Sequence, residues 1–278
     1  MQRRRRSRKR VIPGFGVGLG VTVAMVSIIV LIPLISIVIS TLHLTFAEFI
    51  TTIAKPRVLH AFWVSISCSL CAAVVNLILG VLLAWVLVRY QFPFRRLMDG
   101  LLELPFALPT AIAGIALTSL TVNTGWVGSL FARAGISVAY TRLGITIALI
   151  FVGIPFVART VQPVLEKLDP TYEEAADLMG AGRGLIFRRI ILPELRPAAL
   201  TGFGLAFARG LGEYGSVVFI AGNQPYKTEI APLLIYSQLQ EYDYGEATAI
   251  ALVMLIIAFV LLFLMNHIQV RASRRTSG

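Results

Sequence analysis

The sequence predicts an all-α, polytopic membrane protein with six transmembrane helices and with both the N- and C-termini in the cytoplasm. Of its 278 residues, 57% are hydrophobic and only 14% are charged, and the mean hydropathy of +0.81 lies outside the range of soluble globular domains. Apolar runs of about 20 residues, the length of helix that crosses a bilayer core of about 30 Å, recur six times. Lys and Arg gather at alternate ends of these runs, which indicates a fixed topology.

The first element is a basic N-terminal tail, residues 1–13, followed by an apolar run near residues 14–41. Seven Lys and Arg residues lie within Arg3–Arg10. A secretory signal would have an apolar region of about 7 to 15 residues followed by a cleavage site of small residues. The run here is longer and no such site follows it, so we expect an uncleaved first transmembrane helix.

Five further apolar runs complete a single transmembrane domain, which we place at residues 14–268. They lie near residues 61–88, 99–121, 143–164, 198–221 and 246–268. Glu103, Pro105 and Pro109 interrupt the run at 99–121, so this span is expected to be kinked or broken. A short cytoplasmic tail, residues 269–278, is expected to end the chain.

The distribution of cations orients the six spans. With a cytoplasmic N-terminus, eighteen of the 25 Lys and Arg residues fall on the cytoplasmic side and five on the opposite side. The other two, Arg159 and Arg209, lie within spans or at their ends. This bias follows the positive-inside rule and supports an even number of spans.

Several functional classes lack their expected residues. The net charge of +11 would suggest a nucleic-acid partner in a soluble protein, but the cations form short clusters at the ends of apolar runs, so no nucleic acid is expected. Cys68 and Cys71 lie inside an apolar run, where thiols act as small hydrophobic groups. His43, His60 and His267 have no companion ligands at metal spacing. We therefore expect no catalytic residue, metal or cofactor in this chain.

The cytoplasmic side has one loop of real size, at about residues 165–197, which reads KLDPTYEEAADLMGAGRGLIFRRIILPELRP from residue 167 on. Asp169 suits a helix N-cap and Pro170 the first helical position. The first short helix should end at Gly180, and a second, basic segment should run until Pro193 stops it. These signals predict a helix-turn-helix that projects from the membrane face.

The residues of this loop leave two interpretations open. A protrusion of this size suits a docking site for a cytosolic partner. The same two helices could instead lie flat on anionic lipid, which Arg188 and Arg189 would favour.

A motif in the loop resembles a known family. Glu174-Ala175-Ala176, then Gly180, then Ile190-x-Leu192-Pro193 is similar to the EAA loop of the permeases of binding-protein-dependent ABC importers. The resemblance implies a type I ABC importer permease fold, in which the first short helix is a coupling helix seated in a groove of the ATPase subunit. It implies an ATPase-coupling role for Glu174, Ala175, Ala176, Gly180, Ile190, Leu192 and Pro193.

The same resemblance implies what each residue does. The alanines would permit close approach, Glu174 would pair with a cation of the ATPase, and Gly180 would permit the turn. The Walker A pattern G-x-x-x-x-G-K-[ST] does not occur in the sequence. ATP and Mg²⁺ are therefore expected to bind to two partner ATPase subunits, and the chain itself is expected not to be an enzyme.

Two ionisable residues, Arg209 and Glu213, lie one helical turn apart in the fifth apolar run. A charge at the centre of a transmembrane helix costs about 2.5 to 3.5 kcal/mol on insertion scales, so it normally faces a protein interior or a water-filled cavity and has a partner. The i, i+4 spacing makes each the natural partner of the other. The pair could fix helix packing, offer Arg209 to an anion in a pathway, or belong to a gate or subunit interface.

The segments FARGLGEYGSVVFIAGN, LPFALPTAIAGIALT and FVGIPFVARTVQPVLE are similar to sulfate/thiosulfate permeases of the T-subunit type and, more distantly, to molybdate permeases. This resemblance covers nearly the whole chain. It implies import of sulfate or thiosulfate across the bacterial inner membrane. The implied partners are a second, homologous permease in a heterodimer, two ATPase subunits, an external sulfate-binding protein and membrane lipid.

Two alternatives are weighed against this. One is a molybdate or tungstate ABC permease. The other is an ion-coupled secondary anion transporter, for which an intramembrane Arg209 and Glu213 would be expected, although such carriers often show internal repeats and we find none in this sequence.

Overall fold

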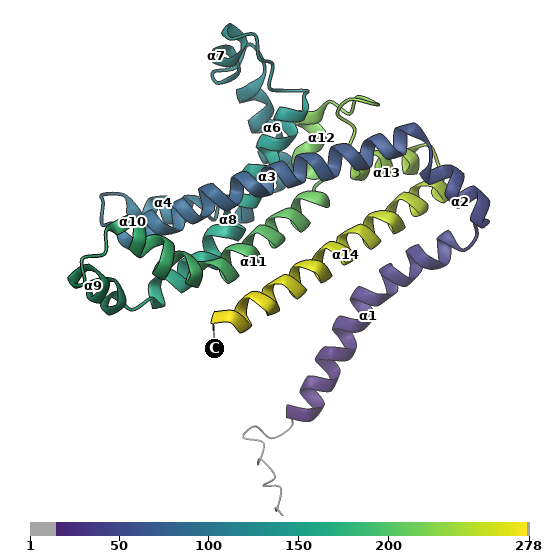
Figure 1. The fold of residues 1–278 in the computed structure, drawn as a ribbon. Coiled ribbons are helices and arrows are strands. Elements are labelled where there is room, and N and C mark those ends of the chain that lie inside the picture. Colours follow the sequence, from purple (N-terminus) through teal and green to yellow (C-terminus); the bar gives the residue numbers. More distant parts are fainter. Residues whose placement is uncertain (1–14, 277–278) are drawn as a thin grey trace, which may run out of the picture.

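The computed structural model describes residues 15–276, in which every regular element is helical (Figure 1). The basic tail expected over residues 1–13 lies outside the described residues. The long helices are α1 (Phe15–Thr41), α3 (Pro56–Arg89), α8 (Arg142–Lys167), α11 (Leu192–Leu211) and α14 (Tyr244–Thr276). By length and composition five helical segments can cross a membrane, and a bent pair makes a sixth when it is counted as one span. The prediction of an all-helical, multi-spanning chain is confirmed at this level.

The third span is broken, as its prolines predicted. It consists of α4 (Arg95–Leu101), α5 (Leu104–Ala107) and α6 (Thr110–Thr121), and its two halves meet at an angle of 111°. Pro109 occupies the N-cap of α6 in an extended conformation. Because proline has no N–H and restricts the residue before it, the helix of the first half cannot continue through this position.

The prediction for the second loop helix was wrong. Instead of stopping at Pro193, one continuous helix runs through α10 (Arg183–Ile186), a π-helical turn η1 (Phe187–Ile191) and α11. The Leu192 N–H donates to the Phe187 carbonyl five residues earlier, so the turn before Pro193 is widened. Pro193 is the second residue after this π-helical turn, so the regular i→i−4 ladder is already interrupted where the proline lacks its N–H.

The fifth span also ends earlier than expected. The apolar run to residue 221 is interrupted after Leu211, and a separate short helix, α12 (Gly215–Ala221), follows. Hydropathy does not reveal this break, because the residues on both sides of it are small or apolar.

The centre of the molecule is formed by α3, α8 and α11, which pack closely side by side (Figure 1). Val157 of α8 lies between two glycines of its neighbours. A Cβ atom on Gly80 would lie 2.6 Å from the Val157 Cβ, and one on Gly202 would lie 2.6 Å from the Val157 Cα. Small residues that allow helix backbones to approach are what drives packing in a membrane, since lipid offers no hydrophobic force between helices.

The remaining helices surround this centre. α14 packs on α11 and on α13 (Ala231–Gln240), and α1 lies along α14 with its side chains largely exposed. At the ends of the spans lie α2 (Phe46–Ile53) and α7 (Gly128–Arg133). Helix α14 continues to Thr276, through most of the tail expected at residues 269–278.

Candidate functional site

The loop that carries the motif forms a short, well-capped helix, α9 (Pro170–Leu178). The carboxylate of Asp169 accepts hydrogen bonds from the Thr171 Oγ1 at 2.6 Å and from the Thr171 N–H at 2.9 Å. These bonds, the one from the hydroxyl first, lower the pKa of Asp169 because they stabilise its charged form. The predicted N-cap and first helical position are therefore confirmed.

The helix ends on Gly180, as the sequence predicted. Gly180 has a φ of +82° and donates its N–H to the Asp177 carbonyl at 2.8 Å, while the Ala181 N–H donates to the Ala176 carbonyl at 3.0 Å. Together these two bonds form a Schellman motif, which requires a left-handed residue at this position. The space around Gly180 is open, so backbone conformation alone explains the glycine.

The two alanines of the motif lie on different faces of α9. Ala176 is only 5% exposed and packs in a cluster with Leu165 of α8 and with Ile186 and Ile191 of the helix that follows the loop. Ala175 is exposed. The motif therefore combines one contact within the chain with one surface position, a division that its spacing alone does not show.

The outward face of α9 is apolar and uncovered. Tyr172, Leu178 and Met179 are 64%, 90% and 81% exposed, and Ala175 and Glu174 are exposed beside them. Residues three, four and seven apart share one side of a helix, so Tyr172, Ala175 and Met179 form a ridge with Leu178 at its edge. Within the described chain nothing covers this ridge.

An ion pair that the sequence analysis missed connects α9 to the spans. Glu173 pairs with Arg89 in the last turn of α3, and the Arg89 guanidinium lies 5.5 Å from the centroid of the Trp85 ring. Both partners are about three-quarters buried. No sequence signal links residues 84 positions apart, because their meeting depends on how α3 and α9 are placed in space.

The second part of the motif, Ile190 to Pro193, contributes to the surface on which α9 packs through Ala176. Ile190 is half-buried against the same cluster as Ala176, and its neighbours Ile191 and Leu195 are buried. Leu192 and Pro193 are half-buried at the start of α11. The structure thus brings together Ala176 and Ile190, while Glu174, Ala175 and Gly180 remain at the surface.

Arg209 and Glu213 do pair, with Nη1 2.5 Å from Oε2, but only Arg209 lies in the helix. Glu213 falls in the break between α11 and α12, is 1% exposed, and accepts at Oε1 from both the N–H and the hydroxyl of Ser216 at 2.9 Å. Its Oε2 contacts the guanidinium without the alignment of a hydrogen bond. Glu213 therefore holds the turn into α12, and Arg209, at 37% exposed, is the member of the pair that the chain does not enclose.

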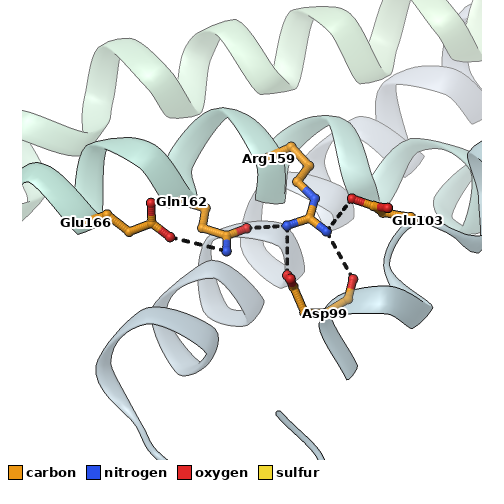
Figure 2. A network of polar contacts seen from close by, with 5 residues as sticks. All are labelled: Asp99, Glu103, Arg159, Gln162 and Glu166. Atoms are coloured by element: carbon orange, nitrogen blue, oxygen red, sulfur yellow. Dashed lines mark hydrogen bonds and ion pairs between the residues drawn. The ribbon is translucent and has the colours of Figure 1, made fainter. Parts of the chain in front are cut away.

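A second polar network, around Arg159 of α8, holds the broken span in place (Figure 2). Arg159 donates to the Asp99 carboxylate at 2.7 Å, to the Asp99 carbonyl at 3.0 Å and to Glu103 at 2.8 Å. Gln162 accepts from the same guanidinium at 2.7 Å and continues the network to Glu166. The sequence analysis gave Arg159 no role, although two carboxylates four residues apart in an apolar run are a signal for a missing cation.

No group of three or more His, Cys, Asp or Glu side chains that could hold a metal ion occurs among residues 15–276. Both cysteines are free thiols, with Cys68 buried and Cys71 exposed. The candidate site is described by the exposed ridge of α9 and by the ion pair of Glu173 with Arg89 beneath it.

Comparison with known proteins places this geometry in a family. Residues 76–278 match the family model described as binding-protein-dependent transport system inner membrane component. The chain is 47% identical to the sulfate transport system permease proteins CysT of Salmonella typhimurium and of Escherichia coli, over 98% of this chain and 98% of each relative.

Solved structures agree on the fold. A bacterial ABC transporter involved in the import of the acidic polysaccharide alginate superposes with a TM-score of 0.76 at 20% identity, over 92% of this chain and 94% of that one. A chain of the MetNI methionine ABC transporter superposes with a TM-score of 0.60 at 17% identity, over 77% of this chain and 95% of that one. The fold is thus that of ABC importer permeases, and the chain belongs to the family of binding-protein-dependent transport system inner membrane components.

Proposed function

We propose that this chain is the permease subunit of an ATP-driven importer that carries sulfate or thiosulfate across the bacterial inner membrane. The observation that carries the proposal is the exposed apolar ridge of α9, which is held firmly against the spans on its other side. The identity of nearly half of all residues to relatives named as sulfate permeases supports the substrate.

Helix α9 is proposed to couple the ATPase to the spans. The ridge of Tyr172, Ala175, Leu178 and Met179 offers about two helical turns of apolar surface to a groove on a cytosolic partner. Movement of α9 would then reach α8 and α11 through Ala176, and α3 through the pair of Glu173 and Arg89. Such coupling needs a rigid connection, and the Schellman motif at Gly180 and the N-cap at Asp169 supply one at each end.

The orientation of the chain is proposed from its contacts and charges. The Leu44 side chain, just after α1, lies 3.2 Å from where a Cβ on Gly245 at the start of α14 would stand. Lys55, at the start of α3, pairs with Glu246 in the same first turn of α14. The other ends of α1, α3 and α14 therefore lie on the opposite side of the membrane from these contacts, the side on which Arg89 of α3 meets Glu173 of α9. The Lys and Arg bias supports a cytoplasmic location for that side, both termini included.

The working complex is proposed to contain a second, homologous permease, two ATPase subunits that bind ATP and Mg²⁺, and an external sulfate-binding protein. Structural neighbours include an alginate ABC transporter solved with a periplasmic protein bound to its substrate, which supports an assembly of this kind. The Arg209 and Glu213 pair is proposed to fix the α11 to α12 turn, which leaves the exposed side of Arg209 free to meet an anion.

The test is sulfate uptake and ATP hydrolysis by the complete complex in proteoliposomes. Leu178→Asp places a charge at the edge of the ridge, on its most exposed side chain, and is expected to remove the ATPase subunits from the purified complex while both permeases remain paired. Leu130→Asp is the matched control, since Leu130 is also an exposed leucine, on α7 far from α9 (Figure 1). Uptake that depends on membrane potential and survives loss of every ATPase partner would refute the ABC importer, and uptake of molybdate in preference to sulfate would refute the substrate.

A further inference from the structure

A row of alternating leucines and arginines covers the outer side of the continuous helix that follows α9. Leu185, Arg189, Leu192 and Arg196 are spaced by four, three and four residues, so they lie along one face of α10, η1 and α11, with Arg188 beside them. All three arginines are exposed, whereas Ile186, Ile191 and Leu195, which point to the other side, are buried. The row is therefore a surface of the chain and not part of its core.

The surface is hollowed into a groove of about 710 Å³, lined by Gly184, Leu185, Arg188, Arg189, Leu192 and Arg196. Gly184 contributes no side chain, and nothing lies within 4 Å of where its Cβ would stand, so the groove is open at that end. The lining combines guanidinium groups with leucine side chains and carries no acidic residue.

The arginines of this groove lack carboxylate partners. In the part of the chain that the structure describes, Arg57, Arg89, Arg159 and Arg209 each pair with a carboxylate, but no ion pair or side-chain hydrogen bond involves Arg188, Arg189 or Arg196. The acidic residue nearest in sequence is Glu194, two positions from Leu192 and from Arg196. A separation of two residues turns a side chain away from its neighbours on a helix, so Glu194 does not neutralise this face.

We propose that this groove binds the headgroup of an anionic phospholipid, with the three guanidiniums on the phosphate and with Leu185 and Leu192 against the acyl chains. The groove lies at the start of the segment Arg183–Leu211, which is long and apolar enough to cross the membrane, so it falls where a span leaves the bilayer. Arginine binds phosphate oxygens in a two-pronged geometry, and its aliphatic stem lies along apolar surface while its head reaches the charged interface. Basic residues at this depth attract anionic lipids.

A lipid bound in this groove would affect α9, because the groove lies on the helix against which α9 packs. The groove begins at Gly184, four residues after the Schellman glycine of α9, and the opposite side of the same helix carries Ile186 and Ile191, on which Ala176 rests. A lipid held in the groove would immobilise the helix that forms the seat of α9. This part of the inference rests on the proposed coupling role, whereas lipid binding does not.

The test uses the complete complex, purified in detergent and titrated with phosphatidylglycerol or phosphatidylcholine, with bound lipid counted by native mass spectrometry. The wild type is expected to retain phosphatidylglycerol in preference to phosphatidylcholine. Each arginine near a membrane surface contributes about a five-fold factor in affinity for anionic lipid, so R188Q/R189Q/R196Q is expected to bind phosphatidylglycerol about 100-fold more weakly. R188K/R189K/R196K keeps the charge without the two-pronged geometry and is expected to lose only part of the affinity.

The matched control is R95Q/R96Q, which removes two arginines from another groove that also contains Asp99. This control is expected to retain the wild-type affinity. A loss of about 25-fold in the control, the same five-fold factor for each arginine removed, would show attraction by general surface charge and overturn the site. Unchanged lipid binding in the triple variant would overturn it as well, and loss of the ATPase subunits with lipid binding unchanged would show that the row is a protein contact. None of these results depends on sulfate uptake, so they are independent of the proposed substrate.

Discussion

Replacing Ala176 with leucine is expected to uncouple ATP hydrolysis from transport by displacing α9 from its seat. The Ala176 methyl is 5% exposed and packs against Leu165, Ile186 and Ile191, which belong to the helices on both sides of the loop. A leucine adds three carbon atoms to a side chain that is enclosed by this cluster. The neighbouring Ala175 has the same side chain but is exposed, so the pair separates the internal contact of α9 from its outer face.

The magnitude follows from the cost of overpacking. Inserting extra methylene groups into a packed core costs about 1 to 3 kcal/mol. At room temperature this shifts the equilibrium between seated and displaced α9 by about 5- to 150-fold toward the displaced state. Ala176→Ser, which nearly preserves the volume, is expected to remain close to the wild type in this respect.

The assay measures sulfate imported per ATP hydrolysed in proteoliposomes, together with the subunit composition of the purified complex. Ala176→Leu is expected to keep its ATPase subunits and to hydrolyse ATP, but to import several-fold less sulfate per ATP. Ala175→Leu is expected to leave the permease stable and to reduce the amount of ATPase bound, because the larger side chain projects from the ridge.

Two results would refute this reasoning. A wild-type ratio of sulfate to ATP in Ala176→Leu would show that the buried contact does not transmit motion. Identical behaviour of the two leucine variants, including an equal loss of permease stability, would show that α9 does not have separate inner and outer faces in the working complex.

Three further predictions follow from the same geometry. Gly180→Ala should destabilise the end of α9 by about 1 to 2 kcal/mol, because residue 180 has a φ of +82° in open space, and Gly180→Asn should destabilise it less. Hydrogen exchange of the α9 amides measures both effects. Equal protection of these amides in the wild type and in both variants would contradict a conformational role for Gly180. Arg209→Gln should lower the thermal stability of the complex more than Glu213→Gln does, because it leaves the buried Glu213 carboxylate without its cation, whereas a glutamine at 213 can still accept from Ser216. The reverse order of melting temperatures would contradict the geometry. The pKa of Asp169 is lowered in the folded chain, so its capping contribution is present above the ordinary aspartate pKa and is lost as the pH falls through the lowered value. The difference in hydrogen exchange of the α9 amides between wild type and Asp169→Ala should therefore vanish in acid. A difference that persists below the lowered pKa would exclude a charged cap.

The sequence determined the membrane class, the positions of most spans and the ends of α9. Hydropathy and charge bias act over consecutive residues, so they indicated a chain of long apolar helices and the broken third span at Pro109. Caps are equally local: Asp169, Pro170 and Gly180 set the limits of α9 through bonds that reach at most five residues. The motif around Glu174 led to the permease family through its spacing.

Local sequence signals gave wrong helix ends at two places, where the turn next to the signal is not regular α-helix. Pro193 is a strong stop signal in isolation, but a π-helical turn precedes it and the helix continues through it as α11. The apolar run to residue 221 resembles one span, yet α11 ends at Leu211, and the Glu213 carboxylate in the break accepts from the N–H and hydroxyl of Ser216 in the first turn of α12.

The tertiary structure alone decided which residues meet across the chain. Arg89 meets Glu173, Arg159 meets Asp99 and Glu103, and Ala176 rather than Ala175 faces inward. Each of these contacts depends on the rotation of a helix about its axis and on its depth beside a neighbour. These quantities are fixed by packing many small residues such as Gly80 and Gly202 at once, so no short stretch of sequence contains them.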